Sequence, residues 1–544
     1  MKIKNENNAG RGLVQFSSNE LSHTQIPPGL TFKIKDKNIF FTFPYNEEAK
    51  TMIKGCPDGR RWMERLKQWR VPVTIDNLKY LNNNGFDFDV SVLEQGLKID
   101  PDLKILEPKT KPFKHQTHGL KLCLSNKEVF LMWEMGTGKS WIGVNKVRHF
   151  LDKKILIICP KTVLSSWENE FKKHSDLTPV VVKGSKKKRI EILENNNICL
   201  MNYDLLISLE ELLLSINFEF IILDESHFIK NQSAKRSKIV HKLCKKIEHK
   251  LLLTGTPITQ GPADIFSQYL ALDGGTTFGV SFYAFRGKYY IDKGYGFPDW
   301  QLRDGVIGEI KDKMFLKGHR LKKTDCFDLP PKNYQKIDVE MATEQARIYR
   351  ELEKEMYTLI GDEEITIQYL LSKLIKLNQV TSGFLYTTTD EVRKTIRFNH
   401  NKLKVLGELI GDKPKAVVWC LFREDMEAIT KAYGGVGTDQ WEDFQNDPSI
   451  RLMVGQVHAG GIGITLTAAS FVVYYSQGYS LSDRLQSEDR THRIGTTGTV
   501  TYVDLVCRRT IDEDILKILE AKRTVAGYIT GDIGTDLIQK MREE

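Results

Sequence analysis

Long apolar runs and paired cysteines are the features that this 544-residue sequence lacks. No stretch approaches the roughly 20 apolar residues of a membrane-spanning helix, and the polar N-terminus has no signal-peptide core. The 8 cysteines are scattered without a CxxC pair, which argues against a disulfide framework and against a zinc site. These absences predict a soluble, intracellular protein that is not secreted, has no membrane contact and holds no zinc.

A strong excess of either charge is also missing. Lys and Arg number 79 against 70 Asp and Glu, so the net charge of +9 permits a polyanionic partner without requiring one. Hydrophobic residues make up 41% and charged residues 27%, as in ordinary globular proteins. The length leaves room for roughly three or four domains, each with its own core.

The stretch LMWEMGTGKS, residues 131–140, is the first clear sign of chemistry. A Gly-containing turn before a helix points backbone N–H groups outward, where they can bind phosphate oxygens. Lys139 would reach the β- and γ-phosphates and the Ser140 hydroxyl would bind magnesium. Trp133 stands where the strict P-loop pattern has glycine. The motif alone therefore leaves open a glycine-rich turn with an incidental lysine.

Short apolar runs separated by helix-like stretches surround this motif. They predict buried parallel strands of a doubly wound sheet, with ligands at the carboxyl ends of the strands. A second set follows, and its Gly-rich turn has no phosphate-binding lysine. The runs are 154–160, 196–203, 218–225 and 249–257 in the first set, and 415–422 and 449–476 in the second.

The strand FEFIILDE ends in two adjacent acids, Asp224 and Glu225. Two carboxylates side by side repel each other unless a cation lies between them and phosphate. We expect Asp224 to hold magnesium and Glu225 to orient and activate the attacking water. His227, Thr254 and Thr256 are weaker candidates for coupling nucleotide state to a second ligand, because turn chemistry explains them equally well.

In the second half, Gln486, Arg490 and Arg493 stand at i, i+4 and i+7, on one face of a predicted helix. A sheet without its own P-loop but with arginines on one face can serve the nucleotide of the first half across a cleft. Such arginines stabilise transition-state charge and contribute about 10³–10⁵ in rate. The alternative is a surface helix with local ion pairs such as Asp489 with Arg493.

Near the N-terminus, a strand is expected at 39–43 and a turn at 57–59. Trp62 and Trp69 flank a cluster of cations between Arg60 and Arg70. Aromatic rings interleaved with cations can stack on bases and neutralise phosphates. Two core tryptophans under a solvated basic face explain the same pattern equally well.

The motifs occur in an order that resembles the Swi/Snf family of superfamily-two helicase-like ATPases. The most specific is DESHFIKNQSAKRSK, and the likeness runs from about residue 108 to 525. Residues 31–100 are similar to the HARP-like substrate-recognition region of annealing helicases. The motifs in order are KHQ, EMGTGKS, CPKTVLSSWENEF, DESHFIKNQSAKRSK, LTGTP, HAGGIGITLTAAS and QSEDRTHRIG.

The resemblance implies an α/β fold with two RecA-like doubly wound parallel-sheet lobes, and it assigns roles by position. Gln116 would read adenine, the P-loop would bind ATP together with Gly463, Arg490 and Arg493 of the second lobe, and Asp224 with Ser140 would bind Mg²⁺. Thr465 replaces a typical asparagine, which puts one contact in doubt. The cofactor-binding loop residues are Met135, Gly136, Thr137, Gly138, Lys139 and Ser140; the coupling residues are His227, Thr254, Thr256 and Gln486; the nucleic-acid contacts are Lys161, Thr162, Ser165, Trp167, Asn202, Tyr203, Gly460, Gly461, Thr465, Arg61, Trp62, Arg65 and Trp69.

The expected organisation has four parts. A flexible polar segment (1–30) precedes a small α+β accessory domain (31–100), lobe 1 (101–330, with a helical insertion at about 275–328) and lobe 2 (331–544, with a helical segment at about 341–380 and a C-terminal brace helix).

The sequence thus predicts a monomeric, ATP- and Mg²⁺-dependent translocase on double-stranded DNA that remodels branched DNA. A motor that displaces proteins from DNA, an RNA-duplex remodeller and a nucleotide-gated scaffold remain alternatives. The setting would be the cytoplasm for a bacterial, viral or phage protein, or the nucleus for a eukaryotic one.

Overall fold

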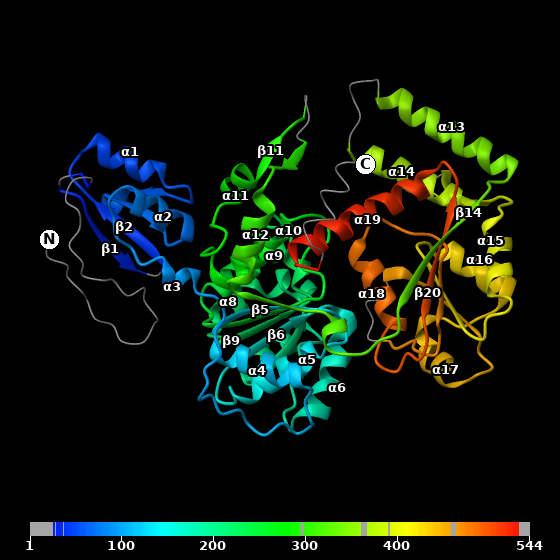
Figure 1. Ribbon diagram of the computed structural model, residues 1–544, viewed down its shortest axis with the longest axis horizontal. Helices are drawn as coiled ribbons and strands as arrows, with labels where there is room; N and C mark the ends of the chain where they lie inside the picture. The colour runs from blue at the N-terminus through cyan, green and yellow to red at the C-terminus, as the bar shows by residue number, and fades with distance from the viewer. Residues whose placement is uncertain are drawn as a thin grey trace.

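The computed structural model describes residues 26–27, 29–35, 37–294, 299–360, 367–389, 392–458 and 464–532. Along its longest axis lie an N-terminal unit, lobe 1 and lobe 2, coloured blue, cyan to green, and yellow to red (Figure 1). Within the described residues, no helix combines the length and apolarity needed to cross a membrane. Most of the polar segment 1–30 lies outside the described residues, but Ile26 and Leu30 pack on the core of the N-terminal unit.

The N-terminal unit is an antiparallel sheet in the order β1-β2-β4-β3, packed with two helices. Inward-facing Ile39 and Phe41 alternate with more exposed neighbours on β2, as the sequence predicts for a strand covered on one face. Asn46 and Thr74 cap the two helices with their side chains. The elements are β1 (Thr31–Lys35), β2 (Asn38–Thr42), α1 (Glu47–Gly55), β3 (Arg61–Met63), β4 (Gln68–Pro72), α2 (Ile75–Asn83) and the short α3 (Ser91–Glu94).

Lobe 1 contains a seven-stranded, wholly parallel sheet in the order β13-β5-β10-β9-β6-β8-β7, with apolar clusters on both faces. The order brings the carboxyl ends of β5, β10 and β9 side by side, which is where the predicted phosphate and acidic motifs stand. Its strands are β5 (Glu128–Trp133), β6 (Ile155–Cys159), β7 (Val180–Val181), β8 (Ile198–Asn202), β9 (Phe220–Asp224), β10 (His249–Leu253) and β13 (Gly318–Leu321); its main helices are α4 (Lys114–Ser125), α5 (Lys139–Arg148), α6 (Leu164–His174), α7 (Lys186–Asn195), α8 (Glu210–Ser215), α9 (Lys235–Cys244) and α10 (Asp264–Asp273).

The predicted helical insertion at about 275–328 is only partly helical. It holds α11 (Phe282–Tyr289), a hairpin of β11 (Tyr290–Asp292) and β12 (Trp300–Leu302), and α12 (Val306–Phe315). Its last part, β13, joins the main sheet beside β5. That edge strand is four residues long and mostly half-buried, so it lacks the apolar run that identifies the central strands.

An ion cluster holds the N-terminal unit against this insertion. Asp76, in the first turn of α2, contacts the ammonium groups of Lys313 at 2.8 Å and Lys288 at 2.9 Å. The backbone N–H of Ile75 donates to the carbonyl of Thr276 at 3.1 Å. Because Lys313 is almost fully buried, its charge depends on Asp76.

We therefore expect Asp76→Ala to loosen the unit and to lower the free energy of unfolding by about 1–3 kcal/mol. Urea unfolding and protease cleavage between residues 95 and 113 would measure both effects. Lys79→Ala is the control, because Lys79 pairs with Glu94 inside the unit at 2.6 Å. Equal effects of the two substitutions would contradict a specific role for Asp76.

Lobe 2 contains a five-stranded parallel sheet in the order β14-β20-β19-β17-β18, so the two-lobed α/β fold class predicted from the sequence is confirmed. The boundary predicted between the lobes, at residues 330 and 331, lies directly before β14, the first strand of lobe 2. The elements are β14 (Lys332–Val339), α13 (Thr343–Ile360), α14 (Ile367–Thr381), the hairpin β15 (Phe384–Thr389) and β16 (Val392–Arg397), α15 (Lys402–Ile410), β17 (Ala416–Cys420), α16 (Arg423–Tyr433), α17 (Trp441–Asn446), β18 (Leu452–Gln456), β19 (Phe471–Tyr474), α18 (Leu481–Thr491), β20 (Val500–Cys507) and α19 (Ile511–Ile529).

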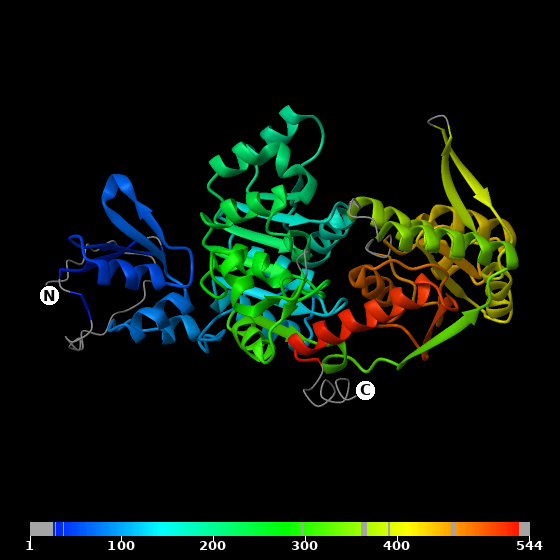
Figure 2. The ribbon, with the colours of Figure 1, turned by 90° about the horizontal axis from the view of Figure 1, so that it is seen from above.

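The C-terminal helix α19 joins the two lobes (Figure 2). Ile511, Ile515 and Leu519 pack within lobe 2. Ile529 is fully buried in the main core of lobe 1, and Asp532 contacts the Arg320 guanidinium at 2.6 Å. The helix thus spans both lobes.

Candidate nucleotide site between the lobes

The loop after β5 has the backbone of a phosphate-binding turn. Gly136 and Gly138 adopt positive φ angles of 76° and 86°. A Cβ at Gly138 would lie 2.0 Å from Nε2 of Gln116, so a side chain there would displace the residue predicted to read adenine. Helix α5 begins at Lys139, and its first N–H groups and positive dipole end therefore lie at the turn.

Lys139 lies inside this loop. Its ammonium donates to the carbonyls of Trp133 at 2.8 Å and Glu134 at 3.1 Å. Burial lowers the pKa of Lys139, and the carboxylates of Glu225 and Asp224 oppose that shift. The loop after β5 and the end of β9 are therefore close enough to act on one ligand.

An aromatic shelf stands next to Gln116 and was missed from the sequence. The Phe113 ring is exposed and stacks on His115 at 5.6 Å, and Phe327 meets both rings edge-on. Gln116 caps its own helix by accepting from the Phe113 N–H at 2.9 Å. His115 bonds the carbonyl of Thr137 in the phosphate loop at 2.9 Å. The motif KPFKHQ carries the missed signal, since an aromatic residue precedes the glutamine.

Asp224 is held by two side chains that were predicted to contact nucleic acid. The indole N–H of Trp167 donates to Asp224 Oδ2 at 2.8 Å, and the Tyr203 hydroxyl donates to the Asp224 carbonyl at 2.9 Å. Trp167 is 1% exposed and Tyr203 2%, so neither side chain can reach a duplex, and the two predictions are wrong. Burial and the adjacent Glu225 raise the pKa of Asp224.

Glu225 occupies a strained backbone position with φ of 49°. Its Oε2 accepts from the Thr254 hydroxyl at 2.9 Å and lies 3.2 Å from Nδ1 of His227. Burial opposes ionisation of Glu225, but the contacts with His227, Lys139 and Thr254 outweigh it and lower its pKa. The geometry thus fixes an ionised carboxylate at the mouth of the sheet.

His227 also faces lobe 2. Its Nε2 lies 3.5 Å from the hydroxyl of Ser482 on α18, and the Gln486 amide donates to the same hydroxyl at 3.2 Å. The structure therefore brings together three predicted coupling residues, His227, Thr254 and Gln486, and adds Ser482. The fourth, Thr256, is buried at the next turn, and its hydroxyl has no hydrogen-bond partner among the described residues.

The two arginines do not share one helix face. Helix α18 ends at Thr491, which places Arg490 on the helix and Arg493 in the turn after it. Arg493 donates to the Thr465 hydroxyl at 3.0 Å, and its Nε lies 4.0 Å from a Cβ built on Gly136. Burial, with Arg493 adding to it and Glu225 opposing it, lowers the pKa of Arg490 to about 9. Arg493 therefore lies beside the phosphate loop, and the buried Arg490 is within range of the charge of Glu225.

The other predicted nucleic-acid contacts on the lobes have mixed surroundings. Lys161, Thr162 and Ser165, around the start of α6, are exposed. Asn202 caps the following turn by accepting from the Asp204 N–H at 3.0 Å. Gly460, Gly461 and Gly463 lie outside the described residues.

On the N-terminal unit, β3 and β4 pair Trp62 with Trp69 and Arg61 with Arg70. Trp62 is 39% exposed and its ring lies 5.6 Å from that of Trp69, which is half-buried against the core of the unit. Arg61 and Arg65 are exposed. Like charges opposite each other destabilise a strand pair, so Arg61 and Arg70 would gain from a bound anion.

The family model described as SNF2-related domain matches residues 60–383, more than half of the chain. The chain belongs to this family. The family confirms the resemblance identified from the motifs and makes the chain an ATP hydrolase.

The chain is also similar to individual curated proteins and to a solved structure. The chain is 26% identical over 545 residues to the SWI/SNF-related matrix-associated actin-dependent regulator of chromatin subfamily A-like protein 1 homolog of Caenorhabditis elegans, covering 93% of this chain and 77% of the relative. It is 26% identical to the DNA annealing helicase and endonuclease ZRANB3 of Homo sapiens, covering 78% of this chain and 40% of the relative. The SWI2/SNF2 ATPase core of Sulfolobus solfataricus in complex with dsDNA matches 80% of this chain and 99% of that chain at 25% identity and a TM-score of 0.40.

Proposed function

We propose that this ATP hydrolase is a translocase on double-stranded DNA that remodels branched DNA. The observation that carries the proposal is the contact of the Glu225–His227 pair of lobe 1 with Ser482 of lobe 2. Through this contact, a change at the carboxylate that handles water alters how the lobes meet. The name of one relative, the DNA annealing helicase and endonuclease ZRANB3, supports the choice of DNA and of an annealing activity.

Within hydrolysis, Lys139 and the N–H groups at the start of α5 bind the phosphates. Glu225 orients the attacking water. Its Oε2 contacts Thr254 and His227, and these contacts fix the orientation of the carboxylate. Arg490 and Arg493 add positive charge from lobe 2 as the terminal phosphate departs.

Magnesium fits the residues present. The Asp224 carboxylate and the Ser140 hydroxyl are oxygen ligands of the kind it prefers, and a cation there would oppose the effects of burial and of the adjacent Glu225, which raise the pKa of Asp224. Among the described residues no cluster of three or more His, Cys, Asp or Glu could hold a metal. The ion would therefore complete its shell with phosphate and water, and it would neutralise charge on the phosphates.

The test is the ATPase rate with single-stranded, duplex, forked and four-way DNA, and with duplex RNA. We expect the highest rate with branched DNA. Equal stimulation by forked and linear duplex would favour the alternative of a motor that displaces proteins without branch preference. Stronger stimulation by duplex RNA would instead indicate an RNA remodeller.

We propose that the β3–β4 hairpin recognises the branch point, because it carries the exposed cations Arg61 and Arg65 beside the rings of Trp62 and Trp69. A base that stacks on such a ring contributes about 1–3 kcal/mol, and unpaired bases occur at junctions and ends. We expect Arg61→Glu with Arg65→Glu to reduce the fork-to-linear ratio of the ATPase rate severalfold and to flatten the salt dependence of fork binding.

The matched control is Lys33→Glu with Lys35→Glu. These exposed lysines lie on β1, at the opposite edge of the same sheet, and the double substitution changes the net charge by the same amount. An unchanged fork-to-linear ratio in the Arg61/Arg65 variant, or an equal loss in the control, would contradict the assignment.

A further inference from the structure

Lys323 is a lobe 1 residue whose side chain enters the nucleotide site, although the sequence analysis assigned it no role. It follows β13, and its backbone N–H donates to the Glu134 carboxylate of the phosphate loop at 2.8 Å. A Cβ built on Gly136 would lie 3.4 Å from Cε and 3.8 Å from Nζ of Lys323. The backbone of Lys323 thus contacts the phosphate loop, and the aliphatic part of its side chain passes Gly136, which shapes that loop.

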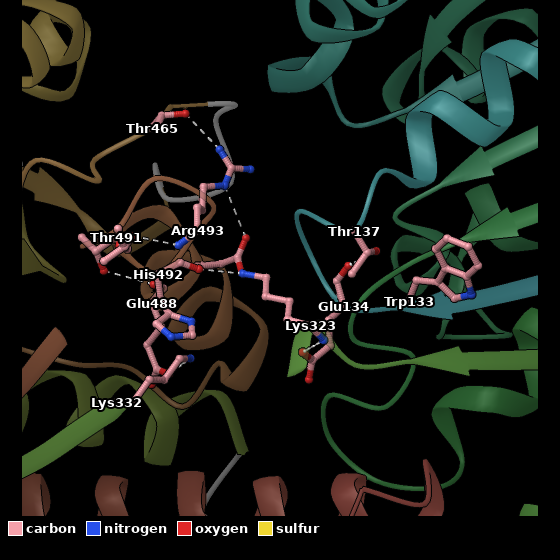
Figure 3. A network of polar contacts seen from close by, with 12 residues as sticks. Trp133, Glu134, Thr137, Lys323, Lys332, Thr465, Glu488, Thr491, His492 and Arg493 are labelled. Atoms are coloured by element: carbon pink, nitrogen blue, oxygen red, sulfur yellow. Dashed lines mark hydrogen bonds and ion pairs between the residues drawn. The ribbon is translucent and has the colours of Figure 1, made fainter. Parts of the chain in front are cut away.

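The ammonium of Lys323 reaches across to the end of α18 (Figure 3). It contacts the Asp489 carboxylate and donates to the His492 carbonyl at 2.8 Å. Both acceptors lie at the carboxyl end of the helix, where the negative end of the helix dipole attracts a cation. This contact holds lobe 2 directly against the phosphate loop.

The surroundings of Lys323 carry an excess of positive charge. Burial lowers the pKa of Lys323, the charges of Lys332, Arg493 and Lys139 act in the same direction, and the Glu134 carboxylate opposes them. A buried group of cations that repel one another is a ready site for an anion. The carboxylates of Asp489 and Glu134 are outnumbered by these cations, and Oδ2 of Asp489 has no hydrogen-bond partner among the described residues.

We propose that Lys323 contacts nucleotide phosphate directly, and that its ammonium exchanges between Asp489 of lobe 2 and the phosphates at the P-loop. Nucleotide binding therefore releases the end of α18. After the exchange Asp489 keeps a cation nearby, because Nε of Arg493 lies 3.8 Å from its Oδ2. The proposal rests on the ATP site described above and adds a residue through which that site controls the lobe contact.

The exchange predicts that substitutions of Lys323 and of Asp489 change nucleotide affinity in opposite directions. Lys323→Met removes a charged contact to phosphate, so it should weaken binding of ADP or of the non-hydrolysable analogue adenylyl imidodiphosphate by about ten- to a hundredfold. Asp489→Asn removes the competitor and should tighten binding severalfold. A purely structural ion pair would respond alike to both substitutions, since each breaks the same contact.

Fluorescence titration of the full chain with both nucleotides decides between these outcomes. Lys322→Met is the control, because Lys322 is the neighbouring cation and contacts Asp532, just after α19, instead of Asp489. Lys323→Arg keeps the charge and should retain part of the affinity, which guards against misfolding of the methionine variant. Shifts in the same direction, or an effect of Lys323→Met alone, would overturn the exchange.

Lys139→Ala separates this proposal from the function on which it rests. If Lys139→Ala leaves nucleotide affinity unchanged, the phosphate site itself is wrong. If it abolishes binding while the Lys323 and Asp489 variants fail to shift in opposite directions, only the exchange is wrong.

Discussion

Glu225→Gln is expected to lower the DNA-stimulated ATPase rate by about 10²–10⁴-fold while nucleotide binding persists. The amide keeps the shape of the side chain and can still accept from Thr254, but it loses the negative charge that orients water. Lys139 also loses an ionic neighbour, so nucleotide affinity should stay the same or rise. Steady-state hydrolysis with DNA present and nucleotide titration without it measure the two quantities.

Glu219→Gln is the matched control for that variant. Glu219 precedes the same strand, β9, at its opposite end and pairs with Lys153 at 3.0 Å. It should hydrolyse ATP at the normal rate. Near-normal turnover by Glu225→Gln, or an equal loss in the control, would remove Glu225 from the mechanism.

The second large effect belongs to the arginines of lobe 2. Arg490→Ala and Arg493→Ala should each lower kcat strongly, by about 10³–10⁵-fold if they act only in the transition state. That range corresponds to about 4–7 kcal/mol. KM for ATP should change much less, because an interaction made in the transition state alone leaves ground-state binding intact.

Arg508→Ala provides the comparison within the same lobe. Arg508 is exposed and pairs with Asp338 at 3.1 Å, away from lobe 1. Its kcat should equal that of the unaltered chain. A rise in KM with normal kcat for either Arg490 or Arg493 would show uniform binding of ATP and would contradict a transition-state role.

The sequence predicted the central strands and the phosphate loop because both depend on local signals. Apolar runs identify β6, β9 and β10, and the glycines of the loop need positive φ angles that few other residues adopt. The missed strand β14 is exposed along most of its length and rich in polar side chains. No apolar run in the sequence therefore indicates its pairing with β20. Such pairings form between segments more than 150 residues apart.

The errors at the site have the same origin. Their positions near a predicted nucleic-acid surface suggested that a tryptophan and a tyrosine contact nucleic acid. Instead, Trp167 and Tyr203 turn inward and donate hydrogen bonds to Asp224. Helical spacing placed Arg493 on α18, but the helix ends two residues earlier. The role of Lys323 was missed because it depends on contacts with Gly136 and Asp489, which are far from Lys323 in the chain.

The packing of α19 also has a consequence for how the protein is made. The last strand of lobe 1 ends at Leu321, yet Ile529, which completes its core, follows roughly 200 residues later. At the usual rate of synthesis, that interval lasts about 10–40 s. During this time the ribosome carries a lobe 1 whose apolar contact surface for Ile529 is uncovered. A nascent chain in this condition is prone to aggregate or to bind chaperones, and a chain truncated before Ile529 would keep that apolar surface exposed.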